Sequence, residues 1–275
     1  LHGGSVESAL EIASQVAPRY FVETMLSWLT HALTMFCDPP EDIYDYGFDS
    51  FATHWYDDIY TVRRAFVRSF IEALITIAQV EPPEFRKIAS QLASLPGETP
   101  QLLITHVYRR LPHLYAQDAC HFLLTDQRRL NLGDSQQYDS RKLIQAIVPH
   151  LSTNQRADPE AAILATFTGI WKPRDIVDLQ WRGIRQLYLL QAIPVDLLTE
   201  QGRRILGELE RKFPGERASD NPRITEGGFI DSPIPSDIAR KMSNRDWLHA
   251  LQKYQKGVRH REFLKGGAEQ LARVL

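Results

Sequence analysis

The sequence predicts an all-α protein, and two observations carry this prediction. Apolar residues recur every three or four positions through most of the chain, and no stretch shows the alternation that marks a β-strand. Proline also stands near the start of several of these stretches, where its missing amide has no helical partner. We expect about ten to twelve short helices and almost no strand, arranged as an irregular α-solenoid of HEAT-like or TPR-like helical hairpins. No strict repeat period is visible, and a compact helical bundle is the alternative.

Composition narrows the protein's class and partners. With 43% hydrophobic residues among 275, the chain has ample core material, and its net charge of -2 provides no general attraction for nucleic acid or an anionic membrane. No run approaches the roughly 20 apolar residues that span a bilayer, so we expect no membrane contact. Cys37 and Cys120 lie far apart, which favours a reducing compartment and a cytoplasmic location. Because the chain starts at Leu1 and stops within a helical pattern, we expect a piece of a longer protein.

The first two helices form a predicted hairpin. Ser5 caps a helix whose apolar side needs a partner, and Pro18 begins a second helix that runs through Phe36. The apolar side of the first helix consists of Val6, Ala9, Leu10, Ala13, Val16 and Ala17.

The segment from Asp38 to Tyr60 interleaves acidic and aromatic residues. One interpretation is a long loop whose rings hold it to the core while its acids stay in water. The other is a recognition surface for a basic protein, since aromatic side chains provide large contact area at low entropic cost. Its candidate contact residues are Tyr44, Tyr46, Trp55 and Tyr56.

Further helices follow from proline positions and apolar spacing. A helix is expected from Thr61 to Val80, and Pro83, Pro100, Pro112 and Pro159 each open another. Thr99 and Asp158 are the expected caps of the helices at Pro100 and Pro159. The remaining expectations are a polar turn at Asp126–Gly133 and helices over Ser140–Leu151, Arg174–Ala192 and Thr199–Phe213.

No catalytic, cofactor or metal site is expected in this chain. His106, His113 and His121 with Cys120 suggest zinc, but Pro112 breaks the helix between the first two, and tight pairs such as CxxC or HxxxH are missing. The GxSxG, HExxH and GxxxxGK[ST] patterns are also absent. An enzyme with residues assembled from distant positions is the alternative, which buried Asp, Glu and His around one pocket would favour.

Paired arginines could bind nucleic acid if the fold aligned them. The pairs expected at the surface are Arg128 with Arg129 and Arg203 with Arg204; Arg63 with Arg64 and Arg109 with Arg110 are two others. Because acidic residues are equally abundant nearby, we expect solvated helix faces, and nucleic acid is not the expected partner. A nucleic-acid-binding repeat module remains the alternative.

Three regions divide the chain. A helical array at 1–213 precedes a connector at 214–235, which we expect to be ordered because Phe229 and Ile234 offer apolar anchors. A helix pair at 236–275 follows, in which Ser243 and Asp246 form a capping-box-like start for the helix of Trp247. The structural markers of the connector are Gly227, Gly228, Pro233 and Pro235.

The last region also carries a family resemblance. SPIP at Ser232–Pro235, KMSNRDWLHALQKY at Lys241–Tyr254 and FLKGGAEQLARVL at Phe263–Leu275 occur in this order. Together with LLTDQRRLNLGDSQQYDSRKLI at Leu123–Ile144, they resemble the C-terminal helical region of bacterial STAND/NACHT-type signalling NTPases, including antiviral defence proteins. The resemblance runs from Tyr20 to Leu275 and is strongest after Asp231, although its motifs are structural and not catalytic.

The resemblance implies a function that the residues alone do not. Such proteins place an NTPase module and an effector upstream of a helical sensor, so it implies that this chain is a non-catalytic sensor or scaffold segment. The implied partners are a foreign protein, such as a phage protein, the upstream NTPase of the same chain, and further copies of the parent. ATP is implied only for the upstream module.

Overall fold

The computed structural model describes residues 3–37, 46, 62–133, 136–166, 182–222, 234 and 241–254. Within these residues the regular structure consists of eleven α-helices and three short 3₁₀ helices, with no strand. The predicted all-α fold is confirmed. The chain divides into two compact units, Leu1–Ile224 (unit 1) and Thr225–Leu275 (unit 2).

Unit 1 begins with α1 and α2, which form the predicted hairpin around Pro18. Its later helices are mostly short and separated by a few residues. In chain order the elements are α1 Gly3–Val16, α2 Pro18–Phe36, α3 Val62–Val80, α4 Pro82–Ala93, α5 Thr99–Arg110, α6 Pro112–Thr125, η2 Gln127–Asn131, α7 Tyr138–Ile147, η3 Val148–His150, α8 Thr153–Ala165, α10 Ile184–Gln191, η4 Val195–Leu197 and α11 Glu200–Lys212.

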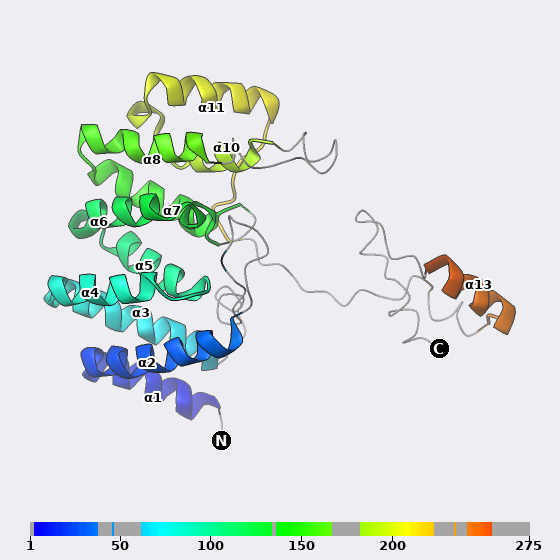
Figure 1. Ribbon diagram of the computed structural model, residues 1–275, viewed down its shortest axis with the longest axis horizontal. Coiled ribbons are helices and arrows are strands. Elements are labelled where there is room, and N and C mark those ends of the chain that lie inside the picture. Colours follow the sequence, from blue (N-terminus) through cyan, green and yellow to red (C-terminus); the bar gives the residue numbers. More distant parts are fainter. Residues whose placement is uncertain are drawn as a thin grey trace. The chain divides into compact units, whose positions relative to one another are not determined.

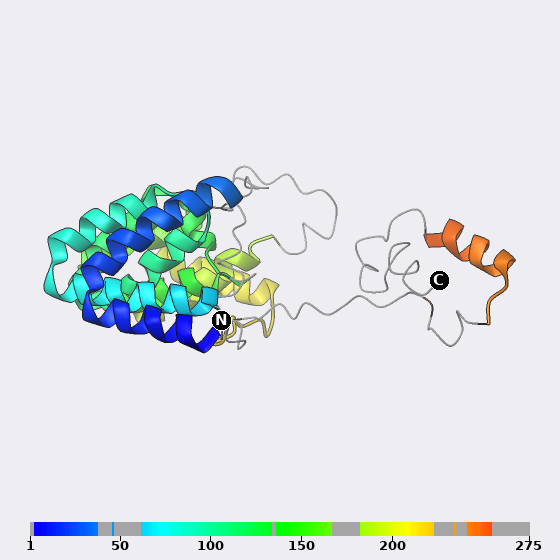
Figure 2. The ribbon, with the colours of Figure 1, turned by 90° about the horizontal axis from the view of Figure 1, so that it is seen from below.

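The helices of unit 1 follow one another as stacked layers from α1 to α11 (Figure 1). The main contacts join close neighbours along the chain: α1 and α2 pack on α3, α5 packs on α7, α6 on α8, and α10 on α11. Figure 2 shows α1 and α2 in front of the other helices when the stack is seen from below. Such neighbour-to-neighbour packing is the arrangement that a solenoid requires, and the solenoid itself stays a prediction.

Edge-to-face aromatic contacts fill the middle of the core. Phe85 lies 5.0 Å from Tyr115 and 5.8 Å from Tyr108, measured between ring centroids. Tyr115 is almost fully buried, and its hydroxyl donates to the carbonyl of Ala78 at 2.6 Å. The polar end of this ring is therefore satisfied inside the core, where an unpaired hydroxyl would be costly.

Three predicted helix starts are wrong. Ser5 does not cap the first helix, because α1 begins at Gly3 and contains Ser5. Helix α8 begins at Thr153 and carries Pro159 inside it, so neither Asp158 nor Pro159 opens it. Its start is fixed by Ser152, whose backbone N–H donates to Gln155 Oε1 at 3.3 Å. Likewise Thr99 does not cap α5, because it is the first helical residue and Glu98 holds the cap position without a side-chain bond.

The predicted helix over Arg174–Ala192 is also corrected. Residues 167–181 lie outside the described part, and α10 begins only at Ile184. Gly183 precedes it with φ +93, a left-handed conformation that interrupts a continuous α-helix. The predicted helix over Thr199–Phe213 is confirmed as α11, with Thr199 accepting from the N–H of Gly202 at 3.1 Å.

The first part of the predicted connector packs on unit 1. Ser219 donates its backbone N–H to Gln136 Oε1 at 2.8 Å, and its carbonyl accepts from Arg141 Nη2 at 2.9 Å. Glu216 accepts from the Gln191 amide at 3.2 Å. These bonds join residues 216–219 to α7, α10 and the turn at Gln136, and the connector itself stays a prediction. Gly227, Gly228, Phe229, Pro233 and Pro235 lie outside the described residues.

In unit 2 the described helix is α13, Asn244–Tyr254. The Ser243 hydroxyl donates to Asp246 Oδ2 at 2.6 Å, and the Ser243 backbone N–H donates to the same oxygen at 3.0 Å. The predicted capping box with Asp in place of Glu is therefore confirmed. Its helix contains Trp247, as predicted.

Two glycines in α11 provide a test of how α8 and α11 are joined. A Cβ at Gly202 would lie 2.5 Å from the buried Glu160 carboxylate, which accepts from the Thr199 N–H and hydroxyl, whereas a Cβ at Gly207 meets only Arg211 Nη1 at 3.7 Å. Gly207→Ala should stabilise the protein by about 0.5–1 kcal/mol through helix propensity. Gly202→Ala should destabilise it by about 1 kcal/mol or more, because the displaced carboxylate loses its bonds. Urea unfolding of both variants measures this, and equal stabilisation by both would contradict the packing described.

Candidate interaction surface

The residues predicted to contact a partner lie in different environments in the structure. Tyr44, Trp55 and Tyr56 lie outside the described residues. Tyr46 is half-buried, and its hydroxyl donates to Asp126 Oδ2 at 2.9 Å. The guanidinium carbon of Arg128 lies 4.4 Å from the Tyr46 ring centroid. Two predicted partner-binding residues therefore contact each other within the chain.

Asp126 joins this small cluster from the N-terminal cap of η2. Arg128 Nη2 donates to its Oδ2 at 2.7 Å. Burial by itself raises the pKa of Asp126, but the hydrogen bonds from Arg128 and Tyr46 outweigh it and hold the pKa below its usual value. The charge of Arg128 is thus matched at short range by this carboxylate.

Arg129 is the clearest correction to the predicted surface. Its side chain is only 6% exposed and therefore presents no contact area to a partner. The guanidinium donates to Phe122 O and Thr125 Oγ1 at 2.7 Å each, to Gln101 Oε1 at 3.1 Å and to Ala93 O at 3.2 Å. It joins the ends of α4 and α6 to the start of α5, which is a structural role.

Arg203 and Arg204 are exposed on α11. Arg203 Nη1 donates to Leu198 O at 2.5 Å, and Arg204 Nε lies 3.9 Å from Glu208 Oε1. Because η2 packs on α6 and α7 while α11 packs on α10, the two arginine pairs lie in different layers. The structure does not bring the four arginines into one basic surface.

A buried polar cluster between α5 and α7 was not predicted as a group. His106 Nε2 lies 3.2 Å from Asp139 Oδ1, and Arg109 Nη1 lies 3.6 Å from the same oxygen. The sequence grouped His106 with His113 and His121, which are both exposed. Asp139 gave no local signal, because only the packing of α5 on α7 brings it to His106.

Burial sets the protonation of this cluster. Asp139 is fully buried, which raises its pKa to about 8 against the opposing effect of Arg141. Burial, together with Arg109 and Arg110, lowers the pKa of His106 well below its ordinary value. Burial therefore favours the uncharged form of both the Asp139 carboxyl and the His106 imidazole.

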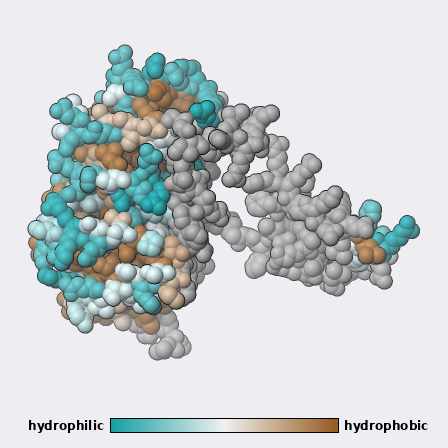
Figure 3. Space-filling model, viewed as in Figure 1, coloured by the Kyte–Doolittle hydropathy of each residue, from teal (hydrophilic) through white to brown (hydrophobic). Residues whose placement is uncertain are grey.

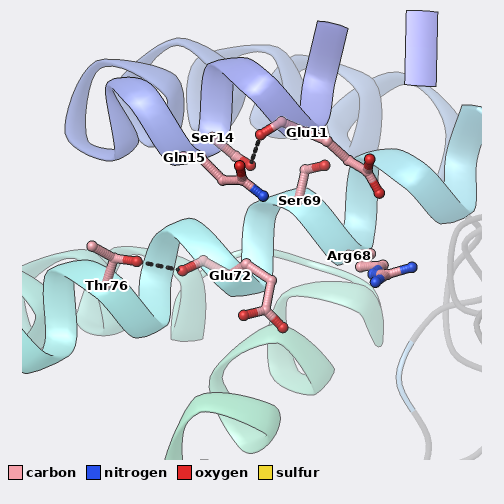
Figure 4. Close-up of a pocket in the computed structure, with 7 residues that line it drawn as sticks. All are labelled: Glu11, Ser14, Gln15, Arg68, Ser69, Glu72 and Thr76. Atoms are coloured by element: carbon pink, nitrogen blue, oxygen red, sulfur yellow. Dashed lines mark hydrogen bonds between the residues drawn. The ribbon is translucent and has the colours of Figure 1, made fainter. Parts of the chain in front are cut away.

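A pocket lies elsewhere, between α1 and α3 (Figure 4), with a volume of about 380 Å³. The Ser14 hydroxyl donates to Glu11 O at 2.8 Å, and the buried Ser69 hydroxyl has no hydrogen-bond partner among the described residues. No histidine or cysteine is among the residues that line it, so the pocket does not pair a nucleophile with an imidazole base. The lining residues are Glu11, Ser14, Gln15, Arg68, Ser69, Glu72 and Thr76.

The described residues contain neither a group of metal-ligating side chains nor a helix that could span a membrane. No three or more His, Cys, Asp and Glu side chains there come together as metal ligands. No helix in the same ranges combines the length and apolar composition that a bilayer crossing requires. Cys120 is buried, and burial raises the pKa of its thiol to about 11.

The outer side of α1 is an exposed apolar stripe. Ile12 and Val16 are 61% and 79% exposed, Val6 is 37% exposed, and Ala9 and Ala13 are exposed between them. We call these five residues the α1 face. The side that α1 turns inward offers only Leu10 and the buried Ser14. Most of the apolar side predicted to need a partner thus lies in water.

The opposite end of unit 1, formed by α11, exposes polar and charged residues. Helix α11 exposes Arg203, Arg204 and Glu208, and hydrophilic residues line its outer edge in Figure 3. The layer of α1 and α2 holds half of the exposed large hydrophobic residues in the described part of the chain, including Tyr20 and Trp28 on α2. A polar outer layer is what ends a helical stack in water, and only the α11 end has one.

The cluster of Asp139 makes stability depend on pH. The folded pKa of Asp139 lies above its unfolded value, so its contribution is largest at low pH and is lost as pH rises toward 8. The contribution of His106 has the opposite sign but ends near pH 6.5, where the unfolded imidazole loses its proton. Between about pH 6.5 and 8 the unfolding free energy should fall by up to about 1.4 kcal/mol per pH unit. Urea unfolding should show this slope in the native chain and in His106→Gln but not in Asp139→Asn, and an unchanged slope in Asp139→Asn contradicts the assignment.

The same substitution at Arg128 and at Arg129 compares the contributions of an exposed and a buried guanidinium to stability. Arg129→Lys should lower the unfolding free energy by about 2–4 kcal/mol, because one ammonium group cannot reach the acceptors on three elements. Arg128→Lys should cost less than about 1 kcal/mol, because its ion pair with Asp126 is partly exposed. Chemical denaturation of the two variants measures the difference, and similar losses in both would refute the buried role of Arg129.

Comparison with known proteins identifies no relative. No protein-family model matches the chain, and no curated protein and no solved structure matches it.

Proposed function

We propose that this chain is a protein-interaction module: a non-catalytic sensor segment of a bacterial STAND-type signalling NTPase that acts in antiviral defence and recognises a phage protein. The observation that carries the interaction role is the α1 face, an uncovered apolar stripe at one end of the stacked helices. Contiguous exposed apolar surface is typical of protein contact sites. The STAND setting comes from the family resemblance of the segment Leu123–Ile144 and of the segments that follow Asp231.

The arginines give the nucleic-acid alternative little support. Arg129 is buried, Arg128 is paired with Asp126, and Arg203 donates to a backbone carbonyl. A buried His106–Asp139 pair exists, but neither residue lines the pocket between α1 and α3. The exposed features of the structure therefore favour an interaction role over a catalytic one.

A plaque assay on the parent protein tests the proposal. Ile12→Glu with Val16→Glu places two charges on the α1 face, and we expect it to abolish protection against phage, because a carboxylate buried without a partner opposes docking. Val195→Glu is the matched control, since Val195 is 59% exposed but lies outside the α1 face. Full protection by the double variant, or no protection by the parent against any phage, would refute the proposal.

A further inference from the structure

The interface between α1 and α3 is polar where it surrounds the pocket of about 380 Å³ (Figure 4). From α1 the pocket is lined by Glu11, Ser14 and Gln15, which share one side of the helix because they lie three and four positions apart. A polar lining between two packed helices costs stability, and departures of this kind from an apolar core are expected at functional sites. The volume lies at the small end of the range for ligand pockets and suits a metabolite.

The hydroxyl of Ser69 is the buried group that points to a ligand. Three hydroxyls line the pocket, and those of Ser14 and Thr76 each donate to a backbone carbonyl of their own helix, at 2.8 and 3.0 Å. Ser69 is only 2% exposed, and its hydroxyl has no hydrogen-bond partner among the described residues. Figure 4 shows this side chain directed from α3 toward α1. Because an unsatisfied buried hydroxyl is costly, an oxygen atom of a bound molecule would be favoured beside it.

Two opposite charges of the pocket are also available to a ligand. The carboxylate of Glu11 and the guanidinium of Arg68 form no hydrogen bond or ion pair within the described part of the chain. Glu72 differs from them, because Arg110 Nη1 of α5 lies 3.5 Å from its Oε1. The pocket therefore offers one anion, one cation and one buried hydroxyl.

This set of groups selects a ligand that carries both charges. A simple anion would be attracted by Arg68 but repelled by Glu11 and Glu72, and a simple cation would be repelled by Arg68. A zwitterion satisfies all the available groups, because its carboxylate can accept from Arg68 and Ser69 while its ammonium group donates to Glu11. Free α-amino acids carry these two charges close together. The exposed amide of Gln15 completes a lining that suits a polar side chain.

We propose that the pocket between α1 and α3 binds a free α-amino acid with a polar side chain. The ligand's carboxylate accepts from Arg68 and Ser69, and its ammonium group donates to Glu11. Because the ligand contacts both helices, its binding stabilises the packing of α1 on α3. The pocket lies on the side of α1 that is turned to α3, whereas the α1 face is turned to water, so amino-acid binding does not depend on the proposed interaction function.

Thermal unfolding of the full chain with each of the common free α-amino acids, followed by calorimetric titration, tests the proposal. We expect an amino acid with a polar side chain to raise the unfolding temperature and to bind as one molecule per chain. Its N-acetylated and α-amidated forms should bind at least about 10-fold more weakly, because each lacks one of the two charges. The proposal is overturned if no free amino acid raises the unfolding temperature, if only apolar ones do, or if the blocked forms bind equally well.

Two serine variants separate binding from folding. Ser69→Ala removes a hydroxyl that only the ligand would satisfy, so the unfolding temperature without ligand should stay unchanged or rise while the affinity falls about 10-fold or more. Ser14→Ala is the matched control in the same pocket, because its hydroxyl is already bonded to Glu11 O, and it should keep the affinity within about twofold. Equal losses of affinity in both variants, or no loss in Ser69→Ala, would contradict the assigned site.

Charge variants test the orientation of the ligand. Arg68→Gln should remove the preference for the free acid over its α-amidated form, and Glu11→Gln should remove the preference over the N-acetylated form, because each variant lacks the partner of one ligand charge. Arg204→Gln changes an exposed arginine of α11 outside the pocket and should behave as the native chain does. The reverse pattern, or the same loss in Arg204→Gln, overturns the proposed orientation.

The two proposals can fail separately. Ile12→Glu with Val16→Glu changes only the α1 face, so this double variant should bind the amino acid as the native chain does. If it loses phage protection and the native chain binds no amino acid, the pocket is refuted and the interaction function is kept. If the native chain binds the amino acid and the double variant protects fully, the pocket is kept and the interaction function is refuted.

Discussion

Each helix of unit 1 can bury its apolar side only against the layers next to it, and the rest of the structure follows from this constraint. Among the described helices, α5 packs on α3, α4, α6 and α7, whereas the main contacts of α1 are with α2 and α3 and those of α11 are with α10. The outer side of helix α11 is exposed to water and carries arginines and glutamates. The outer side of helix α1 carries apolar residues instead, and these uncovered residues form the candidate interaction surface. The surface therefore arises from a position in the stack and not from a catalytic or binding motif.

Buried polar groups fix how the layers sit on one another. Apolar contact between layers is non-directional, but Arg129 requires acceptors on α4, α5 and α6 at once. Glu160 of α8 accepts from Thr199 at the start of α11, and Tyr115 of α6 reaches Ala78 of α3. Sliding one layer past its neighbour would leave these groups unpaired in the core, which costs more than the loss of apolar contact alone.

Local signals predicted the fold class and many helix starts, because those features depend on neighbouring residues. Pro18 and Thr199 begin or cap their helices as expected, and Ser243 forms its capping box. Pro159 misled because proline is also tolerated inside a helix whose start is fixed elsewhere, and the S-x-x-Q pattern at Ser152 was the signal that could have placed that start.

The candidate surface could not be predicted in full, because it depends on packing between residues that are far apart in the sequence. Arg129 looked like a solvated residue in a polar turn, yet acceptors about 30 residues away bury it. The apolar stripe of α1 was visible, but its place at the end of the stack was not, because that place is decided by which helices pack on α3. His106 and Asp139 meet for the same reason.

Confinement of contacts to neighbouring layers also shapes how unit 1 opens. A layer held by one interface requires less free energy to detach than a layer held by two, so local unfolding starts at the ends and need not involve the whole unit. The first layer also lacks the buried arginine that secures α4 to α6. Any partner that covers α1 supplies its missing second interface, and the amides of this layer then exchange with solvent as slowly as those of the interior.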